Sequence, residues 1–459
     1  SFYAFAIWIG LGVLAIADLL KRPLGQKNAA MLSGAVCLLA VPALMASQEW
    51  DDHDRSEKRV AHDMAVNYLQ SCKPNAILFT YGDNDTYPLW YVQEVENVRP
   101  DIRIVNLSLL GTDWYIRGMK QKMNESAPLP ITMANEKFEA GVRDILPFSD
   151  AGIKGSVNVK EVFDFMLSDS QDAKVQYEDG STSNYLPTKN LRIPVNADEV
   201  IRNGIVGEDQ RGKIDSAVTW TYGGNYVTKD NLAMLDILAH NNWKRPVYFA
   251  VTVGSSNMIG LQNYLYNEGF AYELMPLKND TTVQALERTN TQLMYSNVMN
   301  KFQWGNFKHA NYLDHESTTM FYPVVIRWMN TLAENLLAEG KEQEARNILK
   351  KYIDEMPDIY PYMDVAVRKF YMADTLYKLN MQKEANDVVD KVGDYLSDQL
   401  DYFARENEKH PDSSPREVQL GMSLMNELVK LTADQKQTAL NKKLDTSFKG
   451  FQKRFGLYQ

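Results

Sequence analysis

Two long apolar runs open the chain. Residues 2–20 contain one acid, Asp18, and residues 29–47 contain no charged residue. Each run is about as long as a helix needs to cross a bilayer. The residues between the runs carry three basic side chains, Lys21, Arg22 and Lys27. The positive-inside rule therefore predicts a cytoplasmic loop, with everything after about residue 50 outside. A pair of buried core helices is the alternative.

A strand, a helix and a second strand are predicted within residues 76–110. Ala76–Tyr81 is apolar on both faces, as a central parallel strand should be. Pro88 suits the first turn of a helix that runs to about Glu96. Asp101–Leu109 reads as the second strand, which completes a βαβ unit. Another helix is expected at Asp113–Met119.

Helix and strand patterns occur again later in the chain. Within residues 229–253, Leu232, Leu235, Leu238 and Ala239 predict a helix. Residues 245–251 and 268–276 read as strands. Residues 125–225 are rich in Gly, Asp and Ser and predict an irregular insertion, with short strands near Val175, Leu191 and Val218. We predict an α/β domain over residues 50–320, with a mostly parallel sheet and helices on both faces.

Helical periodicity continues from about residue 321 to the end at 459. Residues 332–357 compare with residues 372–396, since Leu336 and Ala345 recur 40 positions later as Leu376 and Ala385. Small and large residues fall at the spacing of tetratricopeptide-like hairpins. That repeat has a period of about 34, so we predict an inserted loop near 358–363. The chain would then comprise two transmembrane helices (1–49), the α/β domain and an all-α repeat domain.

Composition narrows the function classes. The net charge is −10, which argues against a nucleic-acid partner because phosphate contacts need clustered Lys and Arg. The two cysteines and six histidines form no zinc-binding spacing and no HExxH pair.

The first candidate site is the turn after the strand at 76–81. Ligands of open parallel sheets bind beyond the carboxyl ends of the strands. Asp83, Asn84 and Asp85 lie there and could bind sugar hydroxyls, and Asp83 and Asp85 could hold a divalent cation. The alternative is that these side chains only cap the helix and close an Asx turn.

Two further candidates accompany that turn. Asp113 and Trp114 follow the second strand, and an acid beside aromatic rings suits a sugar, although a capping Asp with core aromatics explains them too. A polar segment follows the second apolar run and would lie at the membrane face, unless it is only a linker. It contains Asp52, His53, Asp54 and Arg55. We predict that all three groups converge on one surface near the membrane.

Four phrases together resemble a known family. They are NAILFTYGDNDTYPLWYVQEVENVRPDIRIVNLSLLGTDWYI, EWDDHDRS, YLYNEGFAYELMP and FQWGNF. They look like the C-terminal half of large bacterial membrane proteins that are similar to protein O-mannosyltransferases of the GT-C fold. The resemblance spans residues 1–357 and is densest at 48–120. It implies a polytopic enzyme that uses a lipid-phosphate-linked sugar as donor, with its catalytic carboxylate in a loop upstream of this chain.

Three functions remain open from the sequence. The first is the periplasmic portion of an inner-membrane glycosyltransferase, which recruits an acceptor protein or shapes the active site. The second is a membrane-tethered scaffold whose helical repeats hold an envelope protein. The third is an independent hydrolase on the α/β sheet. The chain begins with Ser at the edge of an apolar run, so we expect it to be the tail of a longer protein.

Overall fold

A computed structural model describes residues 2–278, 284–310, 312–410 and 414–456, except for the side chains of Phe2, Asp51 and Asp52. The chain forms two compact units. One comprises residues 1–58 with 309–314, and the other comprises residues 59–308 with 315–459.

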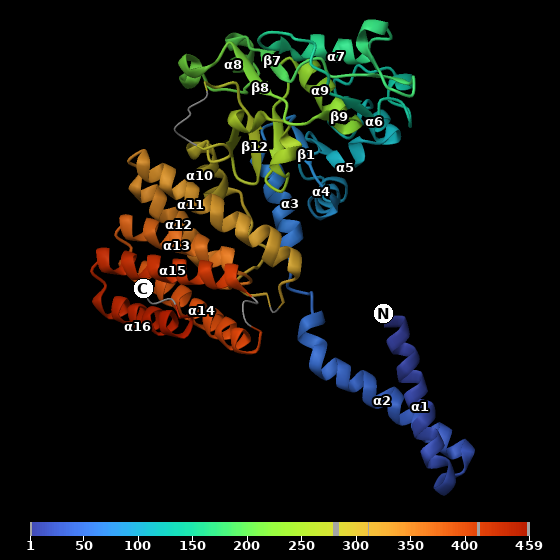
Figure 1. Cartoon of the computed structure of the whole chain (residues 1–459), viewed down its shortest axis with the longest axis vertical. Coiled ribbons are helices and arrows are strands. Elements are labelled where there is room, and N and C mark those ends of the chain that lie inside the picture. Colours follow the sequence, from blue (N-terminus) through green and yellow to red (C-terminus); the bar gives the residue numbers. More distant parts are fainter. Residues whose placement is uncertain (1, 279–283, 311, 411–413, 457–459) are drawn as a thin grey trace. The chain divides into compact units, whose positions relative to one another are not determined.

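The first unit is built on a helical hairpin. Helix α1 (Phe2–Leu24) packs against α2 (Gln26–His53), and both are long and apolar enough to cross a membrane (Figure 1). The predicted loop over residues 21–28 is wrong, because both helices continue until only Gly25 separates them. The one acid of the first run, Asp18, lies 2.6 Å from Lys21 Nζ, so its charge is paired within α1.

The second unit is organised around a five-stranded sheet in the order β11-β12-β10-β1-β2. Its strands, in chain order, are β1 (Ile77–Thr80), β2 (Arg103–Asn106), β10 (Val247–Ala250), β11 (Leu265–Asn267) and β12 (Ala271–Leu274). β1 is parallel to both β10 and β2, whereas β12 is antiparallel to both β10 and β11. The sheet is therefore mixed rather than mostly parallel, because the short link between β11 and β12 forms an antiparallel hairpin.

The predicted βαβ unit is present, with two corrected boundaries. Helix α4 (Asp83–Glu94) begins five residues before Pro88, because Gly82 takes a φ of +94° and turns the chain directly into the helix. The second strand ends at Asn106 rather than Leu109. The Asn106 side chain accepts a hydrogen bond from Leu109 N, which caps the short helix α5 (Leu107–Leu110).

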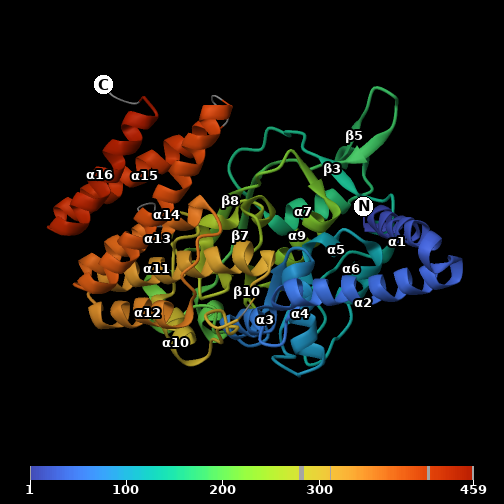
Figure 2. The same cartoon turned by 90° about the horizontal axis from the view of Figure 1, so that it is seen from below.

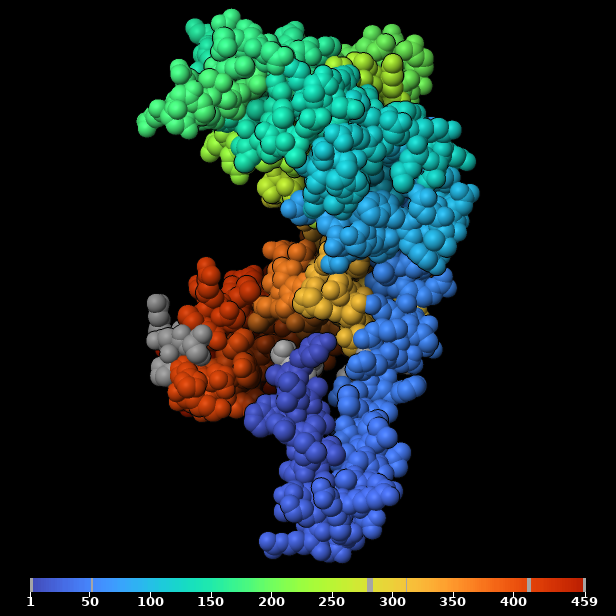
Figure 3. All heavy atoms as spheres, turned by 90° about the vertical axis from the view of Figure 1, so that its right-hand side faces the viewer, coloured from blue at the N-terminus to red at the C-terminus, as the bar shows by residue number. Residues whose placement is uncertain are grey.

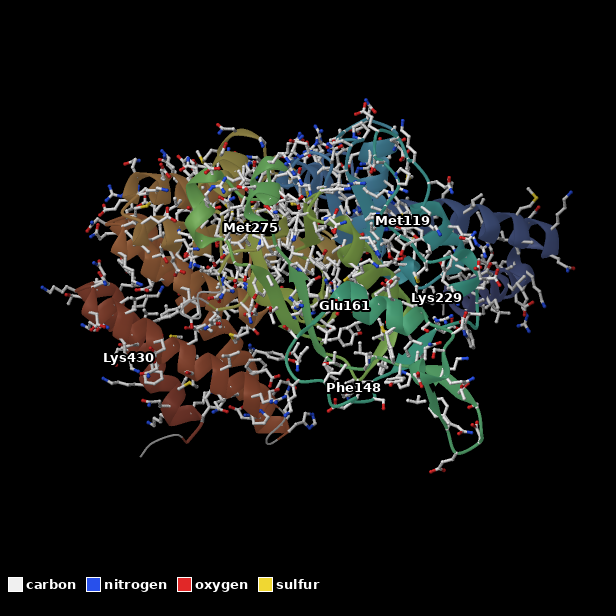
Figure 4. All side chains as sticks on the ribbon, turned by 90° about the horizontal axis from the view of Figure 1, so that it is seen from above. Met119, Phe148, Glu161, Lys229, Met275 and Lys430 are labelled. Atoms are coloured by element: carbon white, nitrogen blue, oxygen red, sulfur yellow. The ribbon has the colours of Figure 1, made fainter. Side chains whose placement is uncertain are left out.

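Helices cover both faces of the sheet. The chain leaves β1 toward β2 through α4, then crosses back to β10 through α9 (Lys229–Asn241). Right-handed crossovers in opposite directions place α4 and α9 on opposite faces. Helix α3 (Val60–Ser71) packs against α4, and α5 packs against α9. Figure 4 labels Lys229 at the start of α9 and Met119 at the end of α6 (Asp113–Met119).

Arginine side chains tie down the amino edge of the sheet. Arg99 donates hydrogen bonds to the carbonyls of Leu69, Cys72 and Lys73 and forms an ion pair with Asp101 at 2.9 Å. Arg103 on β2 is fully buried and donates to the carbonyls of Gly118 and Met119 at the end of α6 and of Gln121 just after it. A guanidinium can bind several carbonyls at once, so Arg99 holds the segment that enters β1 and Arg103 holds the end of α6.

The region predicted as an irregular insertion contains regular structure. The strands expected near Val175, Leu191 and Val218 are β5 (Lys174–Gln176), β7 (Asn190–Pro194) and β8 (Ala217–Thr221). β7 and β8 form a three-stranded sheet with β4 (Val157–Asn158), and α7 (Val159–Leu167) packs against α9. The hairpin of β5 and β6 (Thr182–Asn184) projects from this part of the unit (Figure 2).

Further short elements complete this region. They are β3 (Ile145–Pro147), which pairs with β9 (Tyr226–Thr228), and the helix α8 (Ala197–Arg202). In the space-filling view residues 125–225, coloured cyan to green, form a mass from which one arm projects (Figure 3).

The C-terminal part is helical, as predicted. Its helices are α10 (Thr291–Asn300), α11 (Tyr322–Ala338), α12 (Glu342–Glu355), α13 (Met363–Lys378), α14 (Gln382–Lys409), α15 (Pro415–Asp434) and α16 (Thr438–Arg454). α11 packs on α12, and α13 packs on α14. The recurring residues Ala345 and Ala385 are fully buried. The connection between the two hairpins, residues 356–362, falls where the inserted loop was predicted.

One aromatic cluster joins the helices to the sheet. Phe270, which precedes β12, lies with its ring centroid 5.4 Å from those of both Phe302 and Trp328, and all three rings are buried. Trp328 belongs to α11, so the first helical hairpin shares a core with the sheet. The helical part is therefore not an independent appendage.

The pairing of α3 with the end of α4 should depend on pH. His62 lies 2.7 Å from Asp63 and 2.9 Å from Glu96, and although burial disfavours the imidazolium, these two carboxylates raise the pKa of His62. Protonated His62 therefore stabilises the folded state fully below the unfolded-state pKa of about 6.5. This stabilisation is lost as the pH rises through the higher pKa of His62 in the folded state. We expect His62→Gln to remove a pH-dependent part of the unfolding free energy of less than about 1 kcal/mol. Urea unfolding of both proteins from about pH 5 to about pH 8, which brackets the ordinary histidine pKa of about 6.5, measures this difference. Parallel pH profiles of the two unfolding free energies would contradict the prediction.

Candidate functional site

The order in which the chain connects the strands predicts a ligand site at their carboxyl ends. β1 and β10 are adjacent and parallel, but the chain leaves β1 toward β2 on one side and leaves β10 toward β11 and β12 on the other. Such a topological switch point opens a crevice beyond the carboxyl ends of the two strands. Tyr81 and Gly82 follow β1 there, and Thr252 follows β10.

Asp85 joins these two strand ends. Its side chain is buried, with 2% exposed. One carboxylate oxygen accepts hydrogen bonds from Thr252 Oγ1 at 2.7 Å and from the Tyr81 backbone N–H at 3.1 Å, and the other accepts from Thr86 Oγ1 at 3.1 Å. Burial raises the pKa of Asp85, and these hydrogen bonds partly offset the rise. The carboxylate therefore acts inside the fold as a bridge between β1 and β10.

A second group of hydrogen bonds joins β1 to β2. Asn106 Nδ2 donates to the Gly82 carbonyl and to Thr86 Oγ1, each at 3.0 Å. Thr80 and Thr86 share a hydrogen bond of 2.8 Å, and the Asn106 N–H donates to the Tyr115 hydroxyl at 2.9 Å. Burial raises the pKa of Tyr115 to about 12. Asp85 and Thr86, the last two residues of the GDNDT turn, thus both have structural partners.

Asp83 and Asn84 lie on the surface instead. Asp83 is exposed in the first turn of α4, and its charge raises the pKa of the neighbouring Tyr87. The Asn84 side-chain amide lies 3.4 Å from Met320 Sδ. A divalent cation between Asp83 and Asp85 stays a prediction. Among the described residues, no group of three or more His, Cys, Asp and Glu side chains is placed to hold a metal.

Asp113 and Trp114 open α6, beyond the same edge of the sheet, because β1 and β2 are parallel. Asp113 accepts a hydrogen bond from Trp114 N at 2.8 Å and lies 3.3 Å from Arg117. Trp114 is 59% exposed and meets Tyr115 edge-on. Asp113 thus has local partners, and the Trp114 ring remains accessible.

The segment at residues 52–55 belongs to the other unit. Asp52 and His53 lie in the last turn of α2, not in a linker, and the Asp52 side chain is outside the described residues. His53 Nδ1 lies 2.8 Å from the Glu49 carbonyl, and Asp54 accepts hydrogen bonds from Ser56, which lower the pKa of Asp54. The Arg55 guanidinium lies 3.8 Å from the centroid of the Tyr312 ring. Convergence of this segment with the other two candidate groups stays a prediction.

A cleft of about 820 Å³ lies at the switch point. One wall is the sheet edge, one is the β8–β9 loop with the start of α9, and one is the loop after β10. The lining residues, in chain order, are Tyr81, Leu107, Ser108, Gly111, Tyr222, Gly223, Gly224, Tyr226, Thr228, Asp230, Asn231, Ser255, Ser256, Asn257, Ile259, Gly260 and Gln262. Its volume falls within the range of small-molecule sites, about 300–1,000 Å³.

The walls of the cleft are held together by close contacts. Gly260, at a φ of +97°, approaches β8 so closely that a Cβ would lie 2.2 Å from the Thr221 carbonyl oxygen, which excludes any other residue. The buried Tyr222 hydroxyl donates to the Tyr226 carbonyl and accepts from Asn231 Nδ2, both at 3.0 Å. Burial raises the pKa of Tyr222 to about 12, so this hydroxyl stays protonated at neutral pH. The loops are therefore preformed around the cleft.

Most of the cleft was missed by sequence reasoning. The predictions concentrated on acids beside strand ends, whereas the lining comes largely from YGGNY (222–226) and GSSN (254–257). Both stretches follow predicted strands and combine glycines with hydroxyl or amide side chains, which is the signal that could have found them. Tyr81 and, at the end of the second predicted strand, Leu107 and Ser108 line the cleft. The candidate residues Asp83, Asn84, Asp85, Asp113 and Trp114 do not.

Substitution of Asp85 should reduce stability, because two hydrogen-bond donors would lose their acceptor. Asp85→Ala leaves the Thr252 hydroxyl and the Tyr81 N–H without their acceptor, and we expect a loss of about 1–3 kcal/mol. Asp85→Asn keeps one acceptor oxygen and should lose less. Asp83→Asn is the matched control and should stay within about 0.5 kcal/mol of the parent. Chemical unfolding measures all three; an Asp85→Ala protein as stable as the parent would refute the bridge.

Comparison with known proteins identifies the α/β part. No solved structure matches the chain. The chain is 26% identical over 121 residues to the mouse (Mus musculus) protein O-mannosyl-transferase TMEM260, a match that covers 26% of this chain and 17% of the mouse protein. The family model described as TMEM260-associated domain 2 matches residues 61–293, which hold the five-stranded sheet and the whole cleft. The chain therefore belongs to the TMEM260-associated domain 2 family.

Proposed function

We propose that this chain is the acceptor-handling portion of a membrane glycosyltransferase that transfers sugar to protein hydroxyl groups. The observation that carries the proposal is the preformed cleft at the switch point, which lies within the family match. The two apolar helices and the partial likeness to a protein O-mannosyl-transferase support a membrane-anchored glycosyltransferase-related role. In this proposal the enzyme is of the GT-C type, takes its sugar from a lipid-phosphate donor and lies in a bacterial inner membrane.

The cleft suits binding better than bond cleavage. Among the described lining residues, Asp230 is the only carboxylate, and none is a histidine or a cysteine. General acid–base transfer of a sugar needs a carboxylate placed against the reacting oxygen, and the paired carboxylates of glycoside hydrolysis need two. We therefore assign the transfer step to residues outside this chain and assign the cleft to holding an acceptor.

The helical part adds a surface for the acceptor protein. The α11–α12 and α13–α14 hairpins repeat with matching buried positions, and a groove of about 530 Å³ lies along α11 and α13. Its lining includes Arg327, Glu334, Arg368 and Tyr371. We propose that these tetratricopeptide-like helices engage the protein part of the acceptor. A non-catalytic envelope scaffold that binds a partner through the same hairpins is the alternative function.

Residues after the second apolar helix should lie in the periplasm. Glu178→Cys places a thiol on the exposed β5–β6 hairpin, while Cys72 is buried and Cys37 lies within the second apolar helix. In cells with a permeabilised outer membrane, an impermeant maleimide should label Glu178→Cys and leave the parent unlabelled. Labelling that requires lysis of the inner membrane would reverse the proposed orientation.

Cleft substitutions should impair transfer to a protein acceptor. The Tyr226 side chain is 54% exposed, so Tyr226→Ala removes a contact surface without opening the core. In the intact membrane enzyme that contains this chain, we expect Tyr226→Ala to lower glycosylation of the protein acceptor about tenfold, equal to about 1.4 kcal/mol, at unchanged abundance. Tyr177→Ala, on the projecting hairpin, is the control. Normal transfer by Tyr226→Ala would reject acceptor handling by the cleft and favour the scaffold.

A further inference from the structure

We infer that the cleft at the switch point is a binding site for a neutral saccharide, recognised by the Tyr81 and Tyr226 rings together with Asp230 and Asn257. This inference rests on the proposed function, since it names the ligand class of the same cleft. It also moves sugar recognition away from Asp83 and Asp85, where the sequence predicted it.

The charge of the lining excludes a phosphate clamp. None of the described residues that line the cleft is Lys or Arg, whereas sites for phosphate and carboxylate groups depend on such side chains. The start of α9 opens into the cleft, and a helix N-terminus on its own favours an anion. Asp230 lies in that first turn and supplies the negative charge itself. An anionic ligand would meet repulsion there, and the amide and hydroxyl groups that make up most of the polar lining suit a neutral ligand.

The hydrogen-bonding groups match a polyhydroxy ligand. Asp230 is a pure acceptor when ionised, while the amides of Asn257 and Gln262 and the hydroxyls of Ser255 and Ser256 both donate and accept. A sugar hydroxyl likewise donates and accepts, so it can satisfy an acid and an amide at once. A purely apolar ligand would leave these groups without water or partner, which costs free energy.

Two aromatic rings supply the apolar surface that a pyranose needs. Tyr81 is 47% exposed and Tyr226 is 54% exposed, and they come from different walls of the cleft. The C–H face of a sugar ring can pack on an aromatic face while its hydroxyls reach the polar rim, because a tyrosine combines an apolar body with a polar tip. Both rings are exposed, whereas the apolar side chains of β1 and β10 are buried.

The cleft is preformed, so little ordering is required on binding. The close packing of Gly260 against β8 and the Tyr222 hydrogen bonds fix two of the three walls. A ligand that binds preformed loops avoids the entropy cost of ordering them. A weakly binding neutral sugar could therefore be held, either as a glycan on the acceptor protein or as the sugar of the donor lipid.

The test is direct binding of saccharides to the full chain in detergent. The probes are neutral oligosaccharides of mannose, glucose and galactose, with the same hexose as a polyprenyl-phosphate conjugate in a second arm, measured by saturation-transfer NMR and titration calorimetry. We expect at least one neutral oligosaccharide to bind, and Tyr226→Ala and Asp230→Asn each to weaken its binding about tenfold. Tyr177→Ala should bind as the parent does.

The outcomes separate the saccharide site from the proposed function. If the free oligosaccharide binds at least as tightly as the conjugate, the result supports a site for acceptor glycan. If the conjugate binds more tightly and Tyr226→Ala weakens its binding, the result supports a site for the donor sugar. No saccharide binding by a folded protein overturns the inference, and so does binding that both variants retain. If saccharides fail but an acceptor peptide binds and Tyr226→Ala weakens that binding, the proposed function survives and the inference falls.

Discussion

One buried carboxylate determines the geometry of the cleft. Asp85 reaches back from the first turn of α4 and accepts hydrogen bonds from the residue after β1 and from Thr252 after β10, so it fixes the two strand ends that diverge at the switch point. A buried acid without partners would be costly, but its bonds are satisfied from both strands. The Tyr81 ring depends on this bridge for its position, because the Tyr81 backbone is one of the groups that Asp85 holds.

The two edges of the sheet use opposite chemistry. Arginines bind backbone carbonyls at the amino edge, where Arg99 holds the segment that enters β1 and Arg103 holds the end of α6. At the carboxyl edge, an acid, an amide and hydroxyls bind one another and the backbone. The amino edge is filled by these long side chains, whereas the short groups of the carboxyl edge leave space beyond them for the cleft.

Elements with strong local signals could be predicted from the sequence. The apolar runs, the βαβ unit and the helical hairpins all have clear periodicity, and each is present. The antiparallel β11–β12 pair could not be predicted, because strand direction depends on partners far along the chain. Helix α4 was placed too late because Pro88 fits a first turn, yet Gly82 already permits the turn. The acids were recognised as unusual, but burial of Asp85 against Thr252 involves a contact across 167 positions, and no local pattern reveals it.

The β8–β9 loop differs from the other two walls of the cleft in how much its side chains contribute to the core. The sheet edge and the loop after β10 each contribute a buried residue to the core, Leu107 and Ile259 respectively, so changes at those positions would disturb folding. Residues 223–225 instead connect β8 to β9, and the exposed side chains of Asn225 and Tyr226 contribute little to the core. Changes of the Asn225 and Tyr226 side chains can therefore accumulate at small cost in stability, whereas Gly224 is confined, because a Cβ there would lie 2.8 Å from the Tyr222 ring. Members of the family could therefore diverge in what they recognise while keeping one scaffold, and the loop is the natural place to engineer a new ligand preference.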